Sequence, residues 1–98
     1  MRRENTQTLK EVIALFLEQN PALSWKLAET RLMGAWKNVL GQPMNHYTTK
    51  LFIRNKVLYV TISSSVLKNE LMMCREKLIM RLNEEVGKQV ITDIVFSG

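Results

Sequence analysis

The sequence has 98 residues, of which 46% are hydrophobic, so it can build one modest core but not two folded domains. Lys and Arg number 14 against 9 Asp and Glu, which gives a formal net charge of +5 and favours anionic partners. The single cysteine, Cys74, excludes an intrachain disulfide framework, and no apolar run approaches the roughly 20 residues of a membrane span. We therefore expect one cytoplasmic domain over residues 1–98, with no secretory signal and no membrane contact.

The first half of the chain is predicted to form two helices. Apolar residues recur at helical spacing over residues 9–17, and a capping box that begins at Thr8 would start this amphipathic helix. Pro21 should end it, because proline lacks an N–H group and disfavours helical geometry in the preceding residue. A second helix is expected from an N-cap at Ser24 to Gly41, where a left-handed residue would terminate it.

A β-hairpin is expected next. Residues 47–54 and 57–63 are rich in β-formers, and their apolar residues fall at alternate positions. Asn55 and Lys56 between them fit a two-residue turn, since Asn tolerates positive φ. The two strands should therefore pair antiparallel.

The last third is predicted to be a long helix and a strand. The helix would start at the serine run 63–65 and end at Gly87, with Cys74 buried in its leucine stripe, and residues 90–96 are typical of a strand. Such a helix can connect two parallel strands, so the order ααββαβ predicts an α+β two-layer sandwich. Its three-stranded mixed sheet would carry the helices mainly on one face, an arrangement similar to that of KH domains.

No catalytic or cofactor site is expected. The only imidazole is His46 and the only thiol is Cys74, which is too little for a nucleophile with its base or for a usual zinc site. None of the four glycines belongs to a phosphate-binding loop. The sequence therefore predicts no enzyme, no cofactor, no metal and no small-molecule substrate.

Positive charge is concentrated in the middle of the chain, where residues 31–81 carry nine Lys and Arg against two Glu. Five of these cations are the candidate nucleic-acid contacts: Lys50, Arg54, Lys56, Lys68 and Arg75. Lys68 and Arg75 are seven residues apart and would lie nearly in line on the long helix. A solvated surface that only keeps the domain soluble explains the same charges equally well. Phe52 and Tyr59 either offer stacking platforms to bases or close an edge of the core.

A series of residues from one helix end, through the hairpin, to the next helix start has a characteristic order. It consists of Trp36, Gly41, His46, Thr48, Leu58, Val60, Ser63, Ser64, Glu70 and Leu71. This order and spacing resembles the DciA family of bacterial replicative-helicase loaders. The resemblance implies a KH-like domain that lacks the GxxG clamp and has no ATPase of its own. Many members add a long basic extension, and if that extension carries much of the DNA affinity, a chain that stops at Gly98 is expected either to bind DNA weakly or to need another factor.

The resemblance also implies partners. The expected function is that of a non-enzymatic adaptor that docks on the replicative DNA helicase and assists its loading on single-stranded DNA. Candidate contacts to that protein partner are Trp36, His46, Thr48, Ser63 and Ser64. Trp36 could instead be a packing anchor of the core. The alternative function is a stand-alone DNA- or RNA-binding module that uses the basic hairpin and helix surface.

Overall fold

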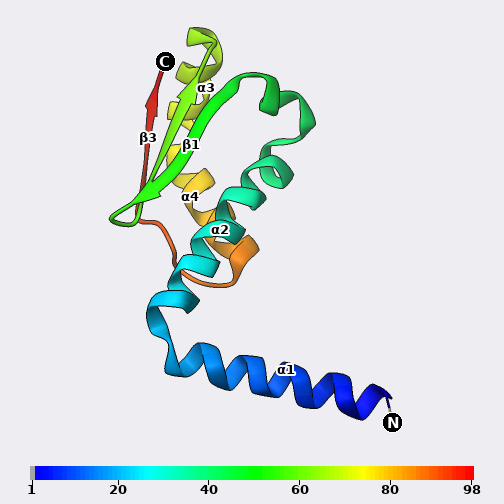
Figure 1. Ribbon diagram of the computed structural model, residues 1–98. Coiled ribbons are helices and arrows are strands. Elements are labelled where there is room, and N and C mark those ends of the chain that lie inside the picture. The colour runs from blue at the N-terminus through cyan, green and yellow to red at the C-terminus, as the bar shows by residue number, and fades with distance from the viewer. Residues whose placement is uncertain (1) are drawn as a thin grey trace.

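The computed structural model describes the backbone of residues 2–98 and the side chains of residues 8–98 (Figure 1). Its elements in chain order are α1 (Arg2–Gln19), α2 (Pro21–Leu40), the 3-10 helix η1 (Gln42–His46), β1 (Thr48–Arg54), β2 (Val57–Ile62), α3 (Ser65–Met73), α4 (Arg75–Val86) and β3 (Asp93–Ser97). The predicted α+β fold is confirmed, with α2, α3 and α4 packed against one face of the sheet (Figure 1). The order is ααββααβ, because the long third helix is in fact two helices.

The sheet has the strand order β1-β2-β3, with β1 antiparallel and β3 parallel to β2. The hairpin turn forms where the sequence predicts it. Asn55 and Lys56 have φ values of 53° and 64°, which is the positive-φ pair that a two-residue hairpin turn requires. The turn fixes the register and places Phe52 opposite Tyr59.

The core lies between this sheet and the helices. Alternate residues of β2 point into it, as the period of two predicts. The fully buried large side chains are Leu32, Trp36, Leu58, Val60, Leu82, Val90, Ile91 and Ile94. Burial of a side chain of this size stabilises the fold by about 1.5–3 kcal/mol, so each of these eight residues contributes substantially to the core.

The predicted single helix over the leucine stripe is wrong, because the chain bends at Cys74. This residue has φ −102° and ψ 11°, ends α3 and begins α4, and its side chain is exposed. The bend allows Leu71 on α3 and Leu78 on α4 both to reach the core of a small sheet. The prediction that Cys74 is a buried core residue is therefore also wrong.

Three predicted boundaries shift for local reasons. Thr8 lies inside α1 and is not its N-cap, since the helix begins at Arg2. The second helix begins at Pro21, not at Ser24, because proline suits the first turn of a helix, where its missing N–H costs nothing. Gly41 ends α2 with φ 95° and ψ 164°, outside the left-handed helical region that the sequence predicts.

The end of α4 follows the prediction, whereas the last strand starts late. Gly87 has φ 79° and ψ 22°, a left-handed cap whose N–H donates to the carbonyl of Asn83. β3 begins at Asp93 instead of residue 90. Residues 90 and 91 lie before this strand and are held by hydrogen bonds to the side chain of Asn83 on α4, not by strand pairing.

Helix α1 projects from the domain and has few contacts beyond the start of α2 (Figure 1). It is amphipathic as predicted, yet its apolar side chains are not buried: Leu9, Val12, Ile13, Leu15 and Phe16 are each 49–59% exposed. With α1 projecting, the molecule is elongated, and its extents along the three principal axes are 54, 26 and 21 Å. Over the described part of the chain, no helix is both long and apolar enough to cross a membrane.

Candidate functional site

The open face of the β-hairpin carries two of the predicted nucleic-acid contacts side by side. Lys50, Phe52 and Arg54 alternate along β1, point away from the helices and are exposed. Residues two apart on a strand are separated by about 7 Å, so the two cations flank the aromatic ring. This face can attract an anionic chain that runs along β1.

The two aromatic rings of this face stack on each other. The centroids of Phe52 and Tyr59 are 4.9 Å apart with an angle of 10° between the ring planes, and the ammonium of Lys50 lies 5.6 Å from the Phe52 centroid. Such a pair contributes about 0.5–1.5 kcal/mol. A nucleobase would have to separate the rings before it could stack between them. The pair therefore stiffens the open face, and each ring has one face covered by the other ring.

The two predicted contacts beyond the hairpin are not arranged as expected. The prediction that Lys68 and Arg75 lie in line on one helix is wrong, because the bend places them on α3 and α4. Arg75 Nε lies 3.7 Å from Asp93 Oδ1, with both side chains about half exposed. Asp93 lowers the positive potential at Arg75, although an exposed pair of this kind contributes at most about 1 kcal/mol.

Lys56, the remaining predicted nucleic-acid contact, stands in the hairpin turn beside a residue that sequence reasoning missed. Its ammonium is 5.2 Å from the ring centroid of Trp25, and the ammonium of Lys88 is 4.7 Å from the same centroid. Trp25 and Lys88 are far from Lys56 in the sequence. No local pattern could have joined these three residues, since only the folded chain brings them together.

Two of the predicted partner contacts are structural. Trp36 is 1% exposed, which confirms it as a packing anchor, and its Nε1 donates a hydrogen bond of 3.1 Å to Thr48 Oγ1. Thr48 in turn donates to the carbonyl of Met44, 3.0 Å away. The chain of bonds ties α2, η1 and the start of β1 together. The ring of Trp36 packs beneath η1 and the start of β1, and it is too deeply buried to contact another molecule.

The other three predicted partner contacts gather at one end of the domain. His46 is exposed at the end of η1, and the backbone N–H of Ser63 donates to the carbonyl of Tyr47, 2.8 Å away. Ser64 Oγ accepts from the N–H of Leu67 and so caps α3, as the serine run predicts. We call the exposed side of this end the η1 surface, which comprises Gln42, Pro43, Asn45, His46 and Tyr47.

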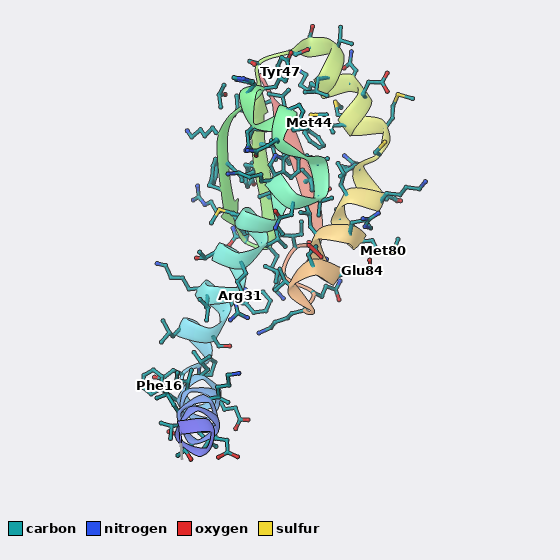
Figure 2. The ribbon with its side chains drawn as sticks, turned by 90° about the vertical axis from the view of Figure 1, so that its right-hand side faces the viewer. Phe16, Arg31, Met44, Tyr47, Met80 and Glu84 are labelled. Carbon is teal, nitrogen blue, oxygen red and sulfur yellow. The ribbon has the colours of Figure 1, made fainter. Side chains whose placement is uncertain are left out.

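The η1 surface and the hairpin turn lie at opposite ends of β1. Figure 2 shows Tyr47 and Met44 at one end of the layered domain, and in Figure 1 the turn between β1 and β2 is at the other end. Seven residues of strand separate them, which corresponds to about 20 Å. A protein on the η1 surface would therefore leave the basic turn accessible.

The described residues hold neither a cluster of metal ligands nor an unpaired buried polar side chain. Within residues 8–98, no group of three His, Cys, Asp or Glu side chains could hold a metal ion. In the same range, every buried side-chain nitrogen or oxygen has a hydrogen-bond partner. The candidate functional features of this part of the chain are two exposed surfaces, the basic hairpin at one end and the η1 surface at the other.

Comparisons with known proteins agree with the sequence pattern. The model of the family described as "Dna[CI] antecedent, DciA" matches residues 8–96. A UPF0232 protein of Mycobacterium leprae is 26% identical over 86 residues, which are 88% of this chain and 46% of the relative. A UPF0232 protein of Mycolicibacterium smegmatis is 27% identical over 82 residues, which are 84% of this chain and 42% of the relative. The chain thus spans less than half the length of these curated relatives.

Proposed function

The chain belongs to the DciA family, and from that premise we propose that it is a non-enzymatic adaptor that docks on the replicative DNA helicase and assists its loading on single-stranded DNA. The observation that carries the proposal is the separation of two exposed surfaces at opposite ends of β1. An adaptor needs such an arrangement, because it must hold a protein and a DNA strand at the same time without a steric conflict.

The docking end is the η1 surface. His46 and Tyr47 are exposed there, and the hydrogen-bonded chain from Trp36 through Thr48 to Met44 holds their backbone in place. A surface that is ordered before binding loses little conformational entropy when a partner arrives. The combination of exposed polar side chains and a rigid support favours this end for contact with the helicase.

The DNA end is the basic hairpin. Lys50, Arg54 and Lys56 are exposed, and none of them forms an ion pair with the residues that the structure describes. Contacts of three lysine and arginine side chains with phosphates release counterions, so binding should weaken steeply as salt rises. The small number of such contacts favours weak binding by this domain alone, as expected of an adaptor that acts together with a helicase.

Size-exclusion chromatography with light scattering tests the docking. The purified chain is mixed with the replicative helicase of its own organism at moderate salt, and a stable co-eluting complex is expected. His46→Glu, which places a charge on the η1 surface, should abolish the complex. Gln89→Glu adds the same charge to the exposed segment after α4 and should leave it intact. Absence of a complex at every protein and salt concentration would contradict the proposal.

The alternative is a stand-alone DNA- or RNA-binding module, which the open basic face of the hairpin favours. A salt-titrated binding measurement separates the two functions. Tight binding of nucleic acid by the chain alone, together with no helicase complex, would support the module. Weak binding alone and a stable helicase complex would support the adaptor.

A further inference from the structure

We propose that Trp25, Lys56 and Lys88 form a binding site for an unpaired nucleotide of single-stranded nucleic acid, with the indole for the base and the two ammonium groups for the flanking phosphates. The proposal deepens the DNA-binding half of the proposed function and rests on it for the class of ligand. It adds two residues, Trp25 and Lys88, to the basic hairpin and assigns the base contact to a side chain outside the sheet.

The site is assembled from three segments that the fold fixes in place. Trp25 lies in the first turns of α2, Lys56 in the hairpin turn and Lys88 directly after α4. The backbone of the turn is tied to the segment before β3, because the N–H of Thr92 donates to the carbonyl of Lys56, 2.8 Å away. The side chain of Asn83 holds the same segment to α4. The three residues therefore meet on an ordered framework.

The two lysines of this site are free of direct ion pairs with the described residues, although Glu84 lines the same surface hollow as Lys88. The ammonium groups of Lys56 and Lys88 lie 5.2 and 4.7 Å from one ring centroid, and both lysines are exposed. Within residues 8–98 neither forms an ion pair; the ion pair found there joins Arg75 to Asp93. Two like charges that share one indole repel each other, so an incoming anion is attracted to both. A phosphate chain supplies that anion at a repeating spacing.

Magnitudes favour exchange of the lysines for a base. An exposed cation–π contact contributes about 0.5–1 kcal/mol, whereas stacking of a base on an aromatic side chain contributes about 1–3 kcal/mol. Replacement of an ammonium group by a base on the ring of Trp25 is therefore not unfavourable, because the stacking free energy is at least as large as that of the cation–π contact it replaces. The freed lysine is then close to the phosphates on either side of the base.

The aromatic pair on the open face of the hairpin is less suitable for stacking than the half-buried Trp25. Phe52 and Tyr59 each cover one face of the other's ring, so a base can reach only an outer face, and over Phe52 it would meet the ammonium of Lys50. Over the ring of Trp25 lie the ammonium groups of Lys56 and Lys88, whose long side chains can turn aside. A strand that runs along the open face past Lys50 and Arg54 reaches the turn at Lys56 and then the indole, which makes the site a continuation of the basic hairpin.

The test uses the full chain and a fluorescently labelled oligothymidylate of about 12 nucleotides, with binding followed by anisotropy over a salt series. Trp25→Leu is expected to weaken binding by about fivefold or more, which is the loss of one stacking contact. Trp25→Phe, which keeps a ring, should lie between it and the unmodified chain. An unchanged affinity in Trp25→Leu would overturn the proposal. Near-ultraviolet circular dichroism of the buried Trp36 checks that both variants remain folded.

The lysines are tested by the dependence on salt. Changing both Lys56 and Lys88 to Gln should lower the slope of log affinity against log salt by about 1.4, at about 0.7 for each phosphate contact of a single strand. The matched control Lys26→Gln removes one exposed charge next to Trp25 in the sequence and should lower the slope by less than about 0.7, the value for one phosphate contact. If Lys26→Gln and Lys88→Gln lowered the slope equally, Lys88 would have no specific phosphate contact and the assignment would be refuted.

Two further results distinguish this site from general charge attraction and from helicase docking. A duplex of the same length should bind more weakly than the single strand, because a paired base cannot stack on the indole; equal binding would contradict the site. Trp25→Leu should still co-elute with the helicase, since Trp25 lies near the start of α2 and the η1 surface follows the end of this helix, about 20 Å further along its axis. Loss of DNA binding with helicase binding retained would support the site independently of the docking proposal.

Discussion

Removal of the Asn83 side chain should destabilise the fold strongly. Its Nδ2 donates to the carbonyl of Ile91 at 2.9 Å, and its Oδ1 accepts from the N–H groups of Val90 at 2.9 Å and Ile91 at 3.1 Å. Both of these residues are fully buried, so water cannot replace the lost partners. Asn83→Ala therefore leaves two N–H groups and one carbonyl of a buried segment without partners.

The expected loss follows from these three bonds. Each contributes about 0.5–1.5 kcal/mol net, so the free energy of unfolding should fall by about 2–4 kcal/mol. For a domain of this size, 1 kcal/mol corresponds to about 4–8 °C in the melting temperature, so a fall of at least about 10 °C is expected. Thermal unfolding followed by circular dichroism at 222 nm measures it.

Two variants sharpen the result. Asn83→Asp keeps the two acceptor bonds and loses the donor bond, so it should be intermediate in stability. Asn69→Ala removes an exposed amide on α3 and should change the melting temperature little. A melting temperature of Asn83→Ala within about 2 °C of the unmodified chain would show that the three hydrogen bonds of Asn83 do not stabilise the fold.

Three further perturbations follow from the contacts. Thr48→Val removes the acceptor of the Trp36 N–H and should lower the free energy of unfolding by about 1–3 kcal/mol, measured with urea. Gly87→Ala forces a left-handed residue without creating a clash and should cost about 1–2 kcal/mol, with Gly87→Asn less harmful. Phe16→Ser on the projecting α1 should change thermal stability by less than about 0.5 kcal/mol, and a larger loss would show that α1 packs on the domain.

Features that depend on local chemistry could be predicted from the sequence. The alternation in β2, the positive-φ turn at Asn55 and Lys56, the serine cap of α3 and the left-handed Gly87 all follow from a few neighbouring residues. Each of these signals acts within one turn or one strand pair. They were sufficient for the α+β fold and for placing Lys50, Arg54 and Lys56 on the hairpin.

Features that depend on tertiary packing could not be predicted. Cys74 has no helix breaker beside it, and the bend there results from the need of two helices to reach a small sheet. The apolar face of α1 is exposed, but its sequence pattern is the same as that of a helix face buried in a core, so the sequence alone does not distinguish the two. The cluster at Trp25 joins residues from three distant segments, and Lys88 carries no local signal at all.

The most direct test of the adaptor is a ternary complex on one column. The chain, the replicative helicase of its own organism and a labelled oligothymidylate are mixed at moderate salt, and absorbance of the label is recorded with light scattering. We expect all three to elute together, His46→Glu to release the chain from the helicase, and Trp25→Leu to leave the chain bound to the helicase. A chain that never elutes with the helicase, with or without the oligonucleotide, would show that it is not a helicase adaptor.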